Sequence, residues 1–245
     1  MTENKLKMNE SKTEFIIFGT KKQLSKVRQS SIKVGGDSIE AKSVVRNLGS
    51  MFDSELKMTN HVNHVLKVCY FQLRQLRTIR KYLTPSALKI LIHASVISLL
   101  TTLYGIAETQ LDRLQRLQNY AARIATRDFS DVDSSYVLKK RHWLPIRARI
   151  QYKIQLLTYK AINNTAPKYL QDMLKEQPSV RSTRASNSGL RLIERKSRLM
   201  FGGDRAFSVS APRLWNKLPA SLRSCPNIDS FKRQLKTHLF KEFLM

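Results

Sequence analysis

The feature that most constrains the fold of this chain is a change in the spacing of its apolar residues at Thr59. Before this position, short apolar runs are separated by glycine and polar residues, as in β-strands and their turns. After it, apolar residues recur at every third or fourth position, which places them on one face of an α-helix. The sequence therefore predicts a mainly α protein with a small N-terminal β region, an α+β fold.

The β region is predicted to contain a single strand, a hairpin and a bent segment. The run Phe15–Phe18 is expected to be a strand, because aromatic and β-branched residues lie between polar residues and a Gly-Thr stop. Ser31–Val34 and Ser38–Ala41 flank Gly35-Gly36-Asp37, and glycine supplies the positive φ that a tight hairpin turn needs. Val44–Phe52 contains a glycine and is predicted as a further bent strand or bulge.

Six helices are predicted beyond the β region. They are expected over Thr59–Tyr82, Thr84–Leu100, Ala107–Arg127, part of His142–Asn163, a short stretch after Pro167, and Ile228–Phe243. Thr84 followed by Pro85 is a strong helix start, because Thr caps the helix and Pro needs no intrahelical donor. The predicted core-facing stripes are Val62, Val65, Cys69, Leu73 and Leu76, then Leu111, Leu114, Gln118, Ala121 and Ala125, then Ile146, Ile150, Ile154, Leu157 and Ala161.

Composition and periodicity together divide the chain into four parts. Residues 1–55 form the β region and residues 56–176 a helical domain. Residues 177–189 are rich in Ser, Thr, Asn and Arg and are predicted to be a linker. Residues 190–245 then form a small C-terminal helical region.

The charge of the chain points to an anionic partner. It has 44 Lys and Arg against 18 Asp and Glu, a net charge of +26. Such a surface suits nucleic acid, an anionic membrane surface or an acidic protein, and a polyanion gains most because it releases counterions. The longest apolar stretch, Leu91–Leu103, is interrupted by polar residues, so no membrane span is predicted. Cys69 and Cys225 are expected to be buried thiols, which fits an intracellular protein of the nucleus or cytoplasm.

Two of the predicted helices carry basic stripes that also contain an aromatic residue. Long cations can contact phosphates while a planar ring stacks on a base or sugar, so the pattern favours binding of a nucleic-acid strand. The alternative is a solvated helix face. The candidate residues are Lys67, Tyr70, Arg74, Arg77 and Lys81 on the first helix and Arg113, Arg116, Tyr120, Arg123 and Arg127 on the third.

Metal and nucleophile motifs are weak. His61 and His64 lie one helical turn apart, but no cysteine or carboxylate completes a tetrahedral site, so a surface or first-turn pair is expected. Asp131-Val132-Asp133 lies among serines and is expected to be a solvated loop. Trp143 and Trp215 each lie near a proline and are predicted to pack structurally at helix ends. We predict no metal site and no catalytic cluster.

Six segments, in order, resemble the C-terminal half of the reverse transcriptase from LINE-type, non-LTR retrotransposons of the jockey-like kind. The most distinctive are HWLPIRARI and DRAFSVSAPRLWNKLP, and the resemblance covers nearly the whole chain. The six segments are KTEFIIFG, NLGSMFDSELKMTNHV, LDRLQRLQNYAARI, HWLPIRARIQYKIQLLTYKAIN, GDRAFSVSAPRLWNKLP and SFKRQLKTHLF.

The resemblance implies the end of a polymerase palm, then thumb helices, then a C-terminal region. In the family, catalytic aspartates that hold Mg²⁺ lie on a hairpin just before the segment corresponding to Lys5–Gly19. No Asp-Asp pair occurs in this sequence, so no catalytic residue is carried over and no cofactor is expected. Asn47, Leu48 and Gly49 stand in the place of the primer-grip turn. The strand at Phe15–Phe18 would have paired with palm strands, which predicts a small incomplete sheet over residues 13–41 with an exposed edge.

One segment departs from the family pattern. Between His93 and Tyr104-Gly105 several residues are missing relative to the family. A shortened turn there is expected to rotate the Ala107–Arg127 helix relative to its neighbours.

These observations predict a truncated, non-catalytic derivative of a retrotransposon reverse transcriptase that retains sequence-tolerant binding to RNA, DNA or their hybrid. One alternative is half of a split reverse transcriptase that works with a palm-containing polypeptide. A second is a basic helical module that binds an acidic protein. A third is a translated reading frame without a selected function.

Overall fold

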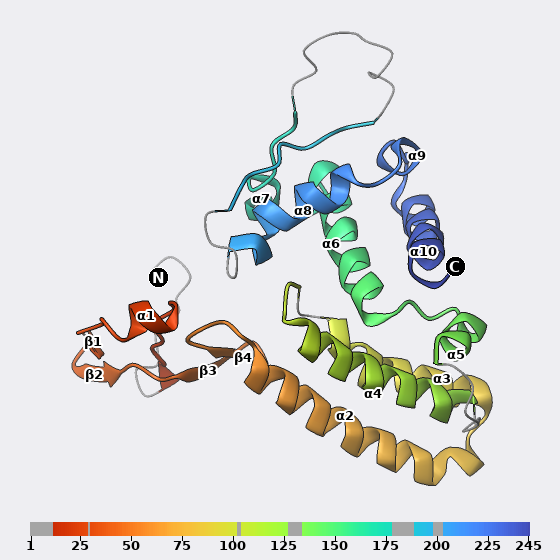
Figure 1. The fold of residues 1–245 in the computed structure, drawn as a ribbon, viewed down its shortest axis with the longest axis horizontal. Helices are drawn as coiled ribbons and strands as arrows, with labels where there is room; N and C mark the ends of the chain where they lie inside the picture. Colours follow the sequence, from red (N-terminus) through yellow and green to blue (C-terminus); the bar gives the residue numbers. More distant parts are fainter. Residues whose placement is uncertain (1–11, 29, 102–103, 127–133, 178–188, 198–202) are drawn as a thin grey trace. The chain divides into compact units, whose positions relative to one another are not determined.

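A computed structural model describes residues 12–28, 30–101, 104–126, 134–177, 189–197 and 203–245 (Figure 1). The chain forms two compact units, Met1–Lys67 and Val68–Met245. The described strands all lie in the first unit, and helices dominate the second. The predicted fold class, mainly α with a small N-terminal β region, is confirmed at this level.

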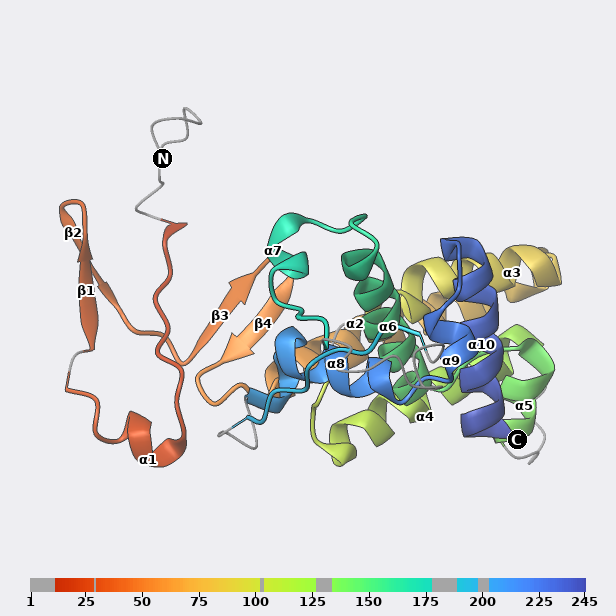
Figure 2. The same ribbon diagram turned by 90° about the horizontal axis from the view of Figure 1, so that it is seen from above.

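Two separate antiparallel hairpins form the β part of the first unit, after a one-turn helix α1 (Lys21–Leu24) (Figure 2). The first pairs β1 (Ser31–Val34) with β2 (Asp37–Glu40), as predicted. Its turn is only two residues long and begins at Gly35, which has a φ of +63°. Glycine adopts this conformation at little steric cost because it has no Cβ.

The second hairpin pairs β3 (Val44–Asn47) with β4 (Ser50–Asp53). The prediction of one bent strand or bulge in this segment is wrong. Leu48 and Gly49 both have positive φ angles, +47° and +84°, which is the conformation of a two-residue hairpin turn that folds the segment back on itself.

The strand predicted at Phe15–Phe18 is also wrong. Only Phe15 makes a single parallel bridge, to Ala41, and Lys42 N–H donates to the Phe15 carbonyl at 2.8 Å. Phe18 is half exposed. The expected incomplete sheet is thus reduced, in the described part of residues 13–41, to β1, β2 and this bridge. Apolar character alone was a poor guide because a strand also needs a neighbour along its length.

The link from the hairpins to the helices is fixed by a carboxylate. Asp53 at the end of β4 accepts hydrogen bonds from the backbone N–H of Lys57 at 2.7 Å and of Met58 at 2.6 Å. Helix α2 (Thr59–Ile79) follows and ends in a 3₁₀ turn at Arg80–Tyr82. Its predicted apolar stripe is buried throughout, which confirms both the helix and its orientation.

Helix α3 (Pro85–Ile92) begins as predicted, because Thr84 Oγ1 accepts a hydrogen bond from Ala87 N–H at 3.2 Å. The chain then passes through a π-helical turn at His93–Ile97 and a 3₁₀ turn at Leu99–Thr101. The predicted extent is therefore right, but the last part is not regular α-helix. Helix α4 (Glu108–Thr126) follows where a helix was predicted, although the predicted end at Arg127 lies outside the described residues. Its predicted stripe is buried except for Leu111, which is half-buried.

Helix α6 (Ile146–Ile162) lies at the centre of the second unit, after α5 (Ser134–Arg141) and before α7 (Lys168–Gln171) (Figure 1). Two glutamines of α4 hold its start. Gln115 Oε1 accepts from Ile146 N–H at 2.9 Å, and Gln118 Nε2 donates to the Leu144 carbonyl at 2.9 Å.

The stripe predicted for α6 is partly wrong. Leu157 is 40% exposed, whereas Gln155, Thr158 and Tyr159 are buried. The reason is that α6 packs against α4 on one side and against α8 (Phe207–Asn216) and α10 (Ile228–Leu244) on the other. A helix with neighbours on several sides buries more than one stripe, so a single apolar period cannot assign its faces.

The C-terminal residues share one core with α6. Phe231 of α10 stacks on Tyr159 of α6 with ring centroids 4.3 Å apart, and Trp215 of α8 lies 5.8 Å from Phe231. Trp215 Nε1 donates to the Leu190 carbonyl at 2.9 Å. A short helix α9 (Ala220–Arg223) joins α8 to α10. Residues 190–245 therefore belong to the same compact unit as α6.

The predictions for the two tryptophans and the two cysteines are confirmed. Trp143 and Trp215 are almost fully buried, and both cysteines are buried free thiols. Burial raises the pKa of Cys69 to about 11, so its thiol stays protonated at neutral pH. Among the helices of the described ranges, none combines the length and apolar character needed to cross a membrane.

Candidate nucleic-acid interface

The basic face predicted on α2 is exposed. Tyr70, Arg74, Arg77 and, in the following 3₁₀ turn, Lys81 all point away from the buried stripe. They recur at three- and four-residue spacing, which keeps them on one side of the helix. Lys67 has the same spacing but is the last residue of the first unit.

The basic face predicted on α4 is less open. Arg116 is exposed, whereas Arg113, Tyr120 and Arg123 are half-buried. Arg113 Nη1 donates to Gln110 Oε1 at 2.9 Å, and Arg116 Nε lies 3.4 Å from the Asp112 carbonyl oxygen. Arg127 lies outside the described residues. The α4 face is therefore a set of partly anchored cations.

The structure brings these two faces together at a tyrosine pair, where residues 68–79 of α2 lie beside α4 (Figure 1). The rings of Tyr70 and Tyr120 have centroids 6.1 Å apart and are tilted by 42°. Arg77 Nη1 lies 3.4 Å from Tyr120 Oη, to which it donates. We define the α2–α4 surface as Tyr70, Arg74, Arg77, Lys81, Arg113, Arg116, Tyr120 and Arg123.

The charge of this surface is poorly balanced. Helix α2 contains no Asp or Glu. Of the two carboxylates on α4, Glu108 is paired with Arg147 of α6. Cations that outnumber the acidic residues beside them repel each other and attract an external anion. The surface can therefore hold a chain of phosphates next to an aromatic pair.

Sequence reasoning missed two exposed aromatic residues near this surface. Phe71 on α2 is 62% exposed, and Tyr82 in the 3₁₀ turn is 77% exposed with Lys81 Nζ 4.8 Å from its ring centroid. The signal was present, because Phe71 falls outside the apolar stripe of α2. Together with Tyr70 they add planar surface on which bases could stack.

The three residues for which the resemblance predicts a primer-grip role lie at the tip of the β3–β4 hairpin in the first unit. Leu48 is fully exposed at that tip, between Asn47 at the end of β3 and Gly49. A fully exposed leucine with a positive φ angle is unusual, because a side chain disfavours that conformation and gains nothing here by burial.

The histidine pair is structural. His61 is buried in the first turn of α2, and its Nδ1 accepts from Met51 N–H at 3.3 Å. Burial, and then the neighbouring His64, lower the pKa of His61. Within the described residues, no group of three or more His, Cys, Asp or Glu side chains could hold a metal ion. Asp131 and Asp133 lie outside those residues.

Comparisons of the chain with known protein families, with curated proteins and with solved structures gave no match.

Proposed function

We propose that this protein binds RNA, DNA or their hybrid in a sequence-tolerant way through the α2–α4 surface, as a non-catalytic relative of retrotransposon reverse transcriptases. The observation that carries the proposal is the Tyr70–Tyr120 pair with arginines on both helices and no acidic residue on α2. The six family-like segments support the assignment of α2–α4 to a thumb and of the hairpins to a palm edge.

Binding would use two kinds of contact. The exposed arginines neutralise phosphates, which releases counterions and gives affinity that falls with salt. The exposed face of Tyr70 stacks on a base, which is sequence-tolerant because every base has a π-face. Tyr120, held by Arg77, supports Tyr70 from the side.

The two contacts can be separated by a salt titration with a labelled RNA–DNA hybrid. The double variant Arg74→Gln/Arg116→Gln should reduce the slope of log K against log salt by about 1.4 to 1.8, since each lost phosphate contact contributes roughly 0.7 to 0.9. Tyr70→Ala should weaken binding about tenfold at every salt concentration and leave the slope unchanged.

The matched control is Lys232→Gln/Arg233→Gln on α10, which removes the same charge from another helix. We expect this control to keep the slope and affinity of the parent protein. A flat salt dependence in the parent, or equal losses in both double variants, would contradict the proposal. Binding to an acidic polypeptide with the same arginine dependence and no effect of Tyr70→Ala would instead identify an acidic-protein module.

A further inference from the structure

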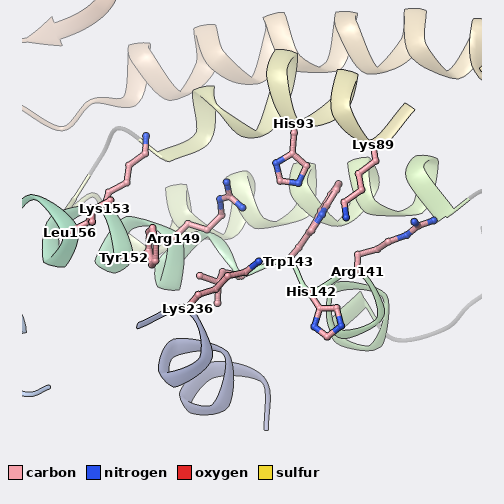
Figure 3. A pocket seen from close by; sticks show the side chains of 11 residues that line it. Lys89, His93, Arg141, His142, Trp143, Arg149, Tyr152, Lys153, Leu156 and Lys236 are labelled. Atoms are coloured by element: carbon pink, nitrogen blue, oxygen red, sulfur yellow. The ribbon is translucent and has the colours of Figure 1, made fainter. Parts of the chain in front are cut away.

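A second basic feature of the second unit is a cavity of about 560 Å³ between α3, α5, α6 and α10 (Figure 3). Lys89 comes from α3, His93 from the π-helical turn, Arg149 from α6 and Lys236 from α10. Trp143 lies between them, with His93 packed edge-on against it at a centroid distance of 4.8 Å. Four segments that are distant in sequence thus direct cationic or protonatable groups toward one space.

The charge in this cavity has no counterpart. Its described lining includes Lys89, Arg149 and Lys236 but no carboxylate. Clustered cations without a partner destabilise a folded protein, because they repel each other and are partly removed from water. Such an arrangement is unfavourable unless an external anion completes it.

Three buried donors of the cavity lining are also unsatisfied. Arg149 Nε, Trp143 Nε1 and Arg141 Nε have no hydrogen-bond acceptor among the described residues. Burial is the main cause that lowers the pKa of Arg149, and Tyr152 opposes it. Trp143 itself is only 2% exposed. Buried donors without acceptors are rare in proteins and call for an explanation such as an absent ligand.

We propose that this cavity binds the phosphate chain of a small polyphosphate ligand, either inorganic or that of a nucleoside triphosphate. The five lysines and arginines that line the cavity, together with His93, match the multiple negative charge of such a chain. Guanidinium and ammonium groups also donate their strongest hydrogen bonds to phosphate oxygens. The proposal stands independently of the α2–α4 surface, because none of its residues belongs to that surface.

The environment of His93 gives the site a pH signature. Burial, followed by the charges of Arg149, Lys89 and Lys236, lowers the pKa of His93 to about 4, so its ring is neutral at pH 7 when the cavity is empty. The other charged or titratable groups that line the cavity are Arg141 and His142 at the end of α5 and Tyr152 and Lys153 of α6. A bound anion favours the protonated ring, so binding should take up a proton and strengthen as the pH falls from 7 toward 5.

The test is calorimetric titration of the whole chain with tripolyphosphate at about 0.15 M salt, which screens exposed charges at distances beyond about 8 Å. Arg149→Gln and Lys236→Gln should each weaken binding about tenfold or more, because each removes a charge-assisted hydrogen bond. The controls Arg147→Gln and Lys232→Gln remove cations from the same two helices at positions that do not line the cavity. They should change the affinity less than about twofold.

Two further ligands identify the source of the phosphate chain, and two further variants separate a binding defect from a folding defect. Equal affinity for tripolyphosphate and a nucleoside triphosphate indicates recognition of the chain alone, and tighter binding of the nucleotide indicates an added base contact. Trp143→Phe keeps an aromatic ring at this position but removes the indole N–H, and should weaken binding. Arg149→Met should raise the Tm of the unliganded protein while removing the Tm increase that tripolyphosphate produces.

Three results would overturn the proposal. The first is an equal loss of affinity for tripolyphosphate in Arg149→Gln and Arg147→Gln. The second is binding of an unphosphorylated nucleoside as tight as that of its triphosphate. The third is a Tm increase with tripolyphosphate that is retained in Arg149→Met. Hybrid binding should be unaffected by Arg149→Gln, so a failure here is distinct from a failure of the nucleic-acid proposal.

Discussion

At the scale of single residues, the scarcity of carboxylates changes how buried cations are satisfied. Arg223 donates to the backbone carbonyls of Leu218, Gly189 and Leu190, and Arg141 donates to that of Ala125. With 44 cationic and 18 acidic side chains, carbonyl oxygens take the role that Asp and Glu have in a balanced protein. Arg149 Nε finds neither kind of acceptor among the described residues, and the same holds for the Nε of Arg141.

His93 makes the stability of the protein depend on pH. Its folded pKa of about 4 lies below the ordinary value of 6.5. Between these two values the unfolded chain binds a proton that the folded chain does not, so the free energy of unfolding falls as the pH falls from 6.5 to 4. Over this pH range, the free energy of unfolding of His93→Gln should fall by about 1 to 2 kcal/mol less than that of the parent. This figure allows for solvent screening of a half-buried ring.

Urea unfolding at pH 7 and pH 4.5 measures this effect. The matched change His142→Gln removes an exposed imidazole from the same cavity and serves as the control for the loss of a histidine. An equal pH dependence in His93→Gln and the parent would show that His93 is not the responsible group.

At the scale of elements, the β3–β4 hairpin carries a strained turn. Leu48 adopts a φ of +47°, is fully exposed, and so gains no burial energy in return. Leu48→Asn creates an Asn-Gly turn, which favours this conformation, and should stabilise the hairpin by about 0.5 to 1 kcal/mol. Slower hydrogen exchange of the β3 and β4 amides would report the gain.

Leu48→Ala is the control for this turn. It removes the same exposed side chain but retains a residue that disfavours positive φ, so exchange should not slow. If both variants slowed exchange equally, loss of the leucine side chain rather than relief of the backbone would be the cause.

Helix α6 donates hydrogen bonds to two segments that pack against it. Its Gln155 Nε2 donates to the Leu214 carbonyl of α8 at 3.2 Å, and its Tyr159 Oη donates to the Cys225 carbonyl at 3.1 Å. These polar side chains are buried because α8 and α10 cover them. The same helix turns Arg149 into the cavity, so the packing that buries α6 also forms the proposed phosphate site.

At the scale of the whole molecule, the core around Phe231 joins α6, α8 and α10 with the segment at Leu192. Phe231 is fully buried and stacks on Tyr159. Phe231→Ala should therefore lower the free energy of unfolding by about 3 to 5 kcal/mol, from lost burial and the cavity left behind. Denaturant unfolding followed by near-ultraviolet circular dichroism would measure the loss.

Phe71→Ala is the matched control, because it truncates the same residue type at an exposed position of α2. Its effect on stability should stay within about 0.5 kcal/mol. Comparable losses in the two variants would mean that residues 190–245 do not share a core with α6.

Local patterns in the sequence were sufficient for the longer helices α2, α4, α6 and α10 and for the start of α3, but they did not predict α5 or α8. The stripe from Val62 to Leu76 and the Thr84-Pro85 cap predicted α2 and the start of α3 correctly, because helix periodicity and capping depend only on nearby residues. The exposed cations of α2 followed from the same stripe. The sequence also predicted the turn at Gly35, where glycine alone removes the steric cost of a positive φ angle.

The remaining features depended on contacts between distant segments. The run at Phe15–Phe18 did not become a strand because strand formation needs a paired neighbour, which no local pattern reports. The meeting of Tyr70 with Tyr120 required the packing of α2 beside α4. The sequence by itself therefore determined the longer helices and the exposed charges of α2, while the anionic partner stays a prediction. Tertiary structure alone decided which cations converge on one space, since that depends on helix packing and not on spacing along the chain.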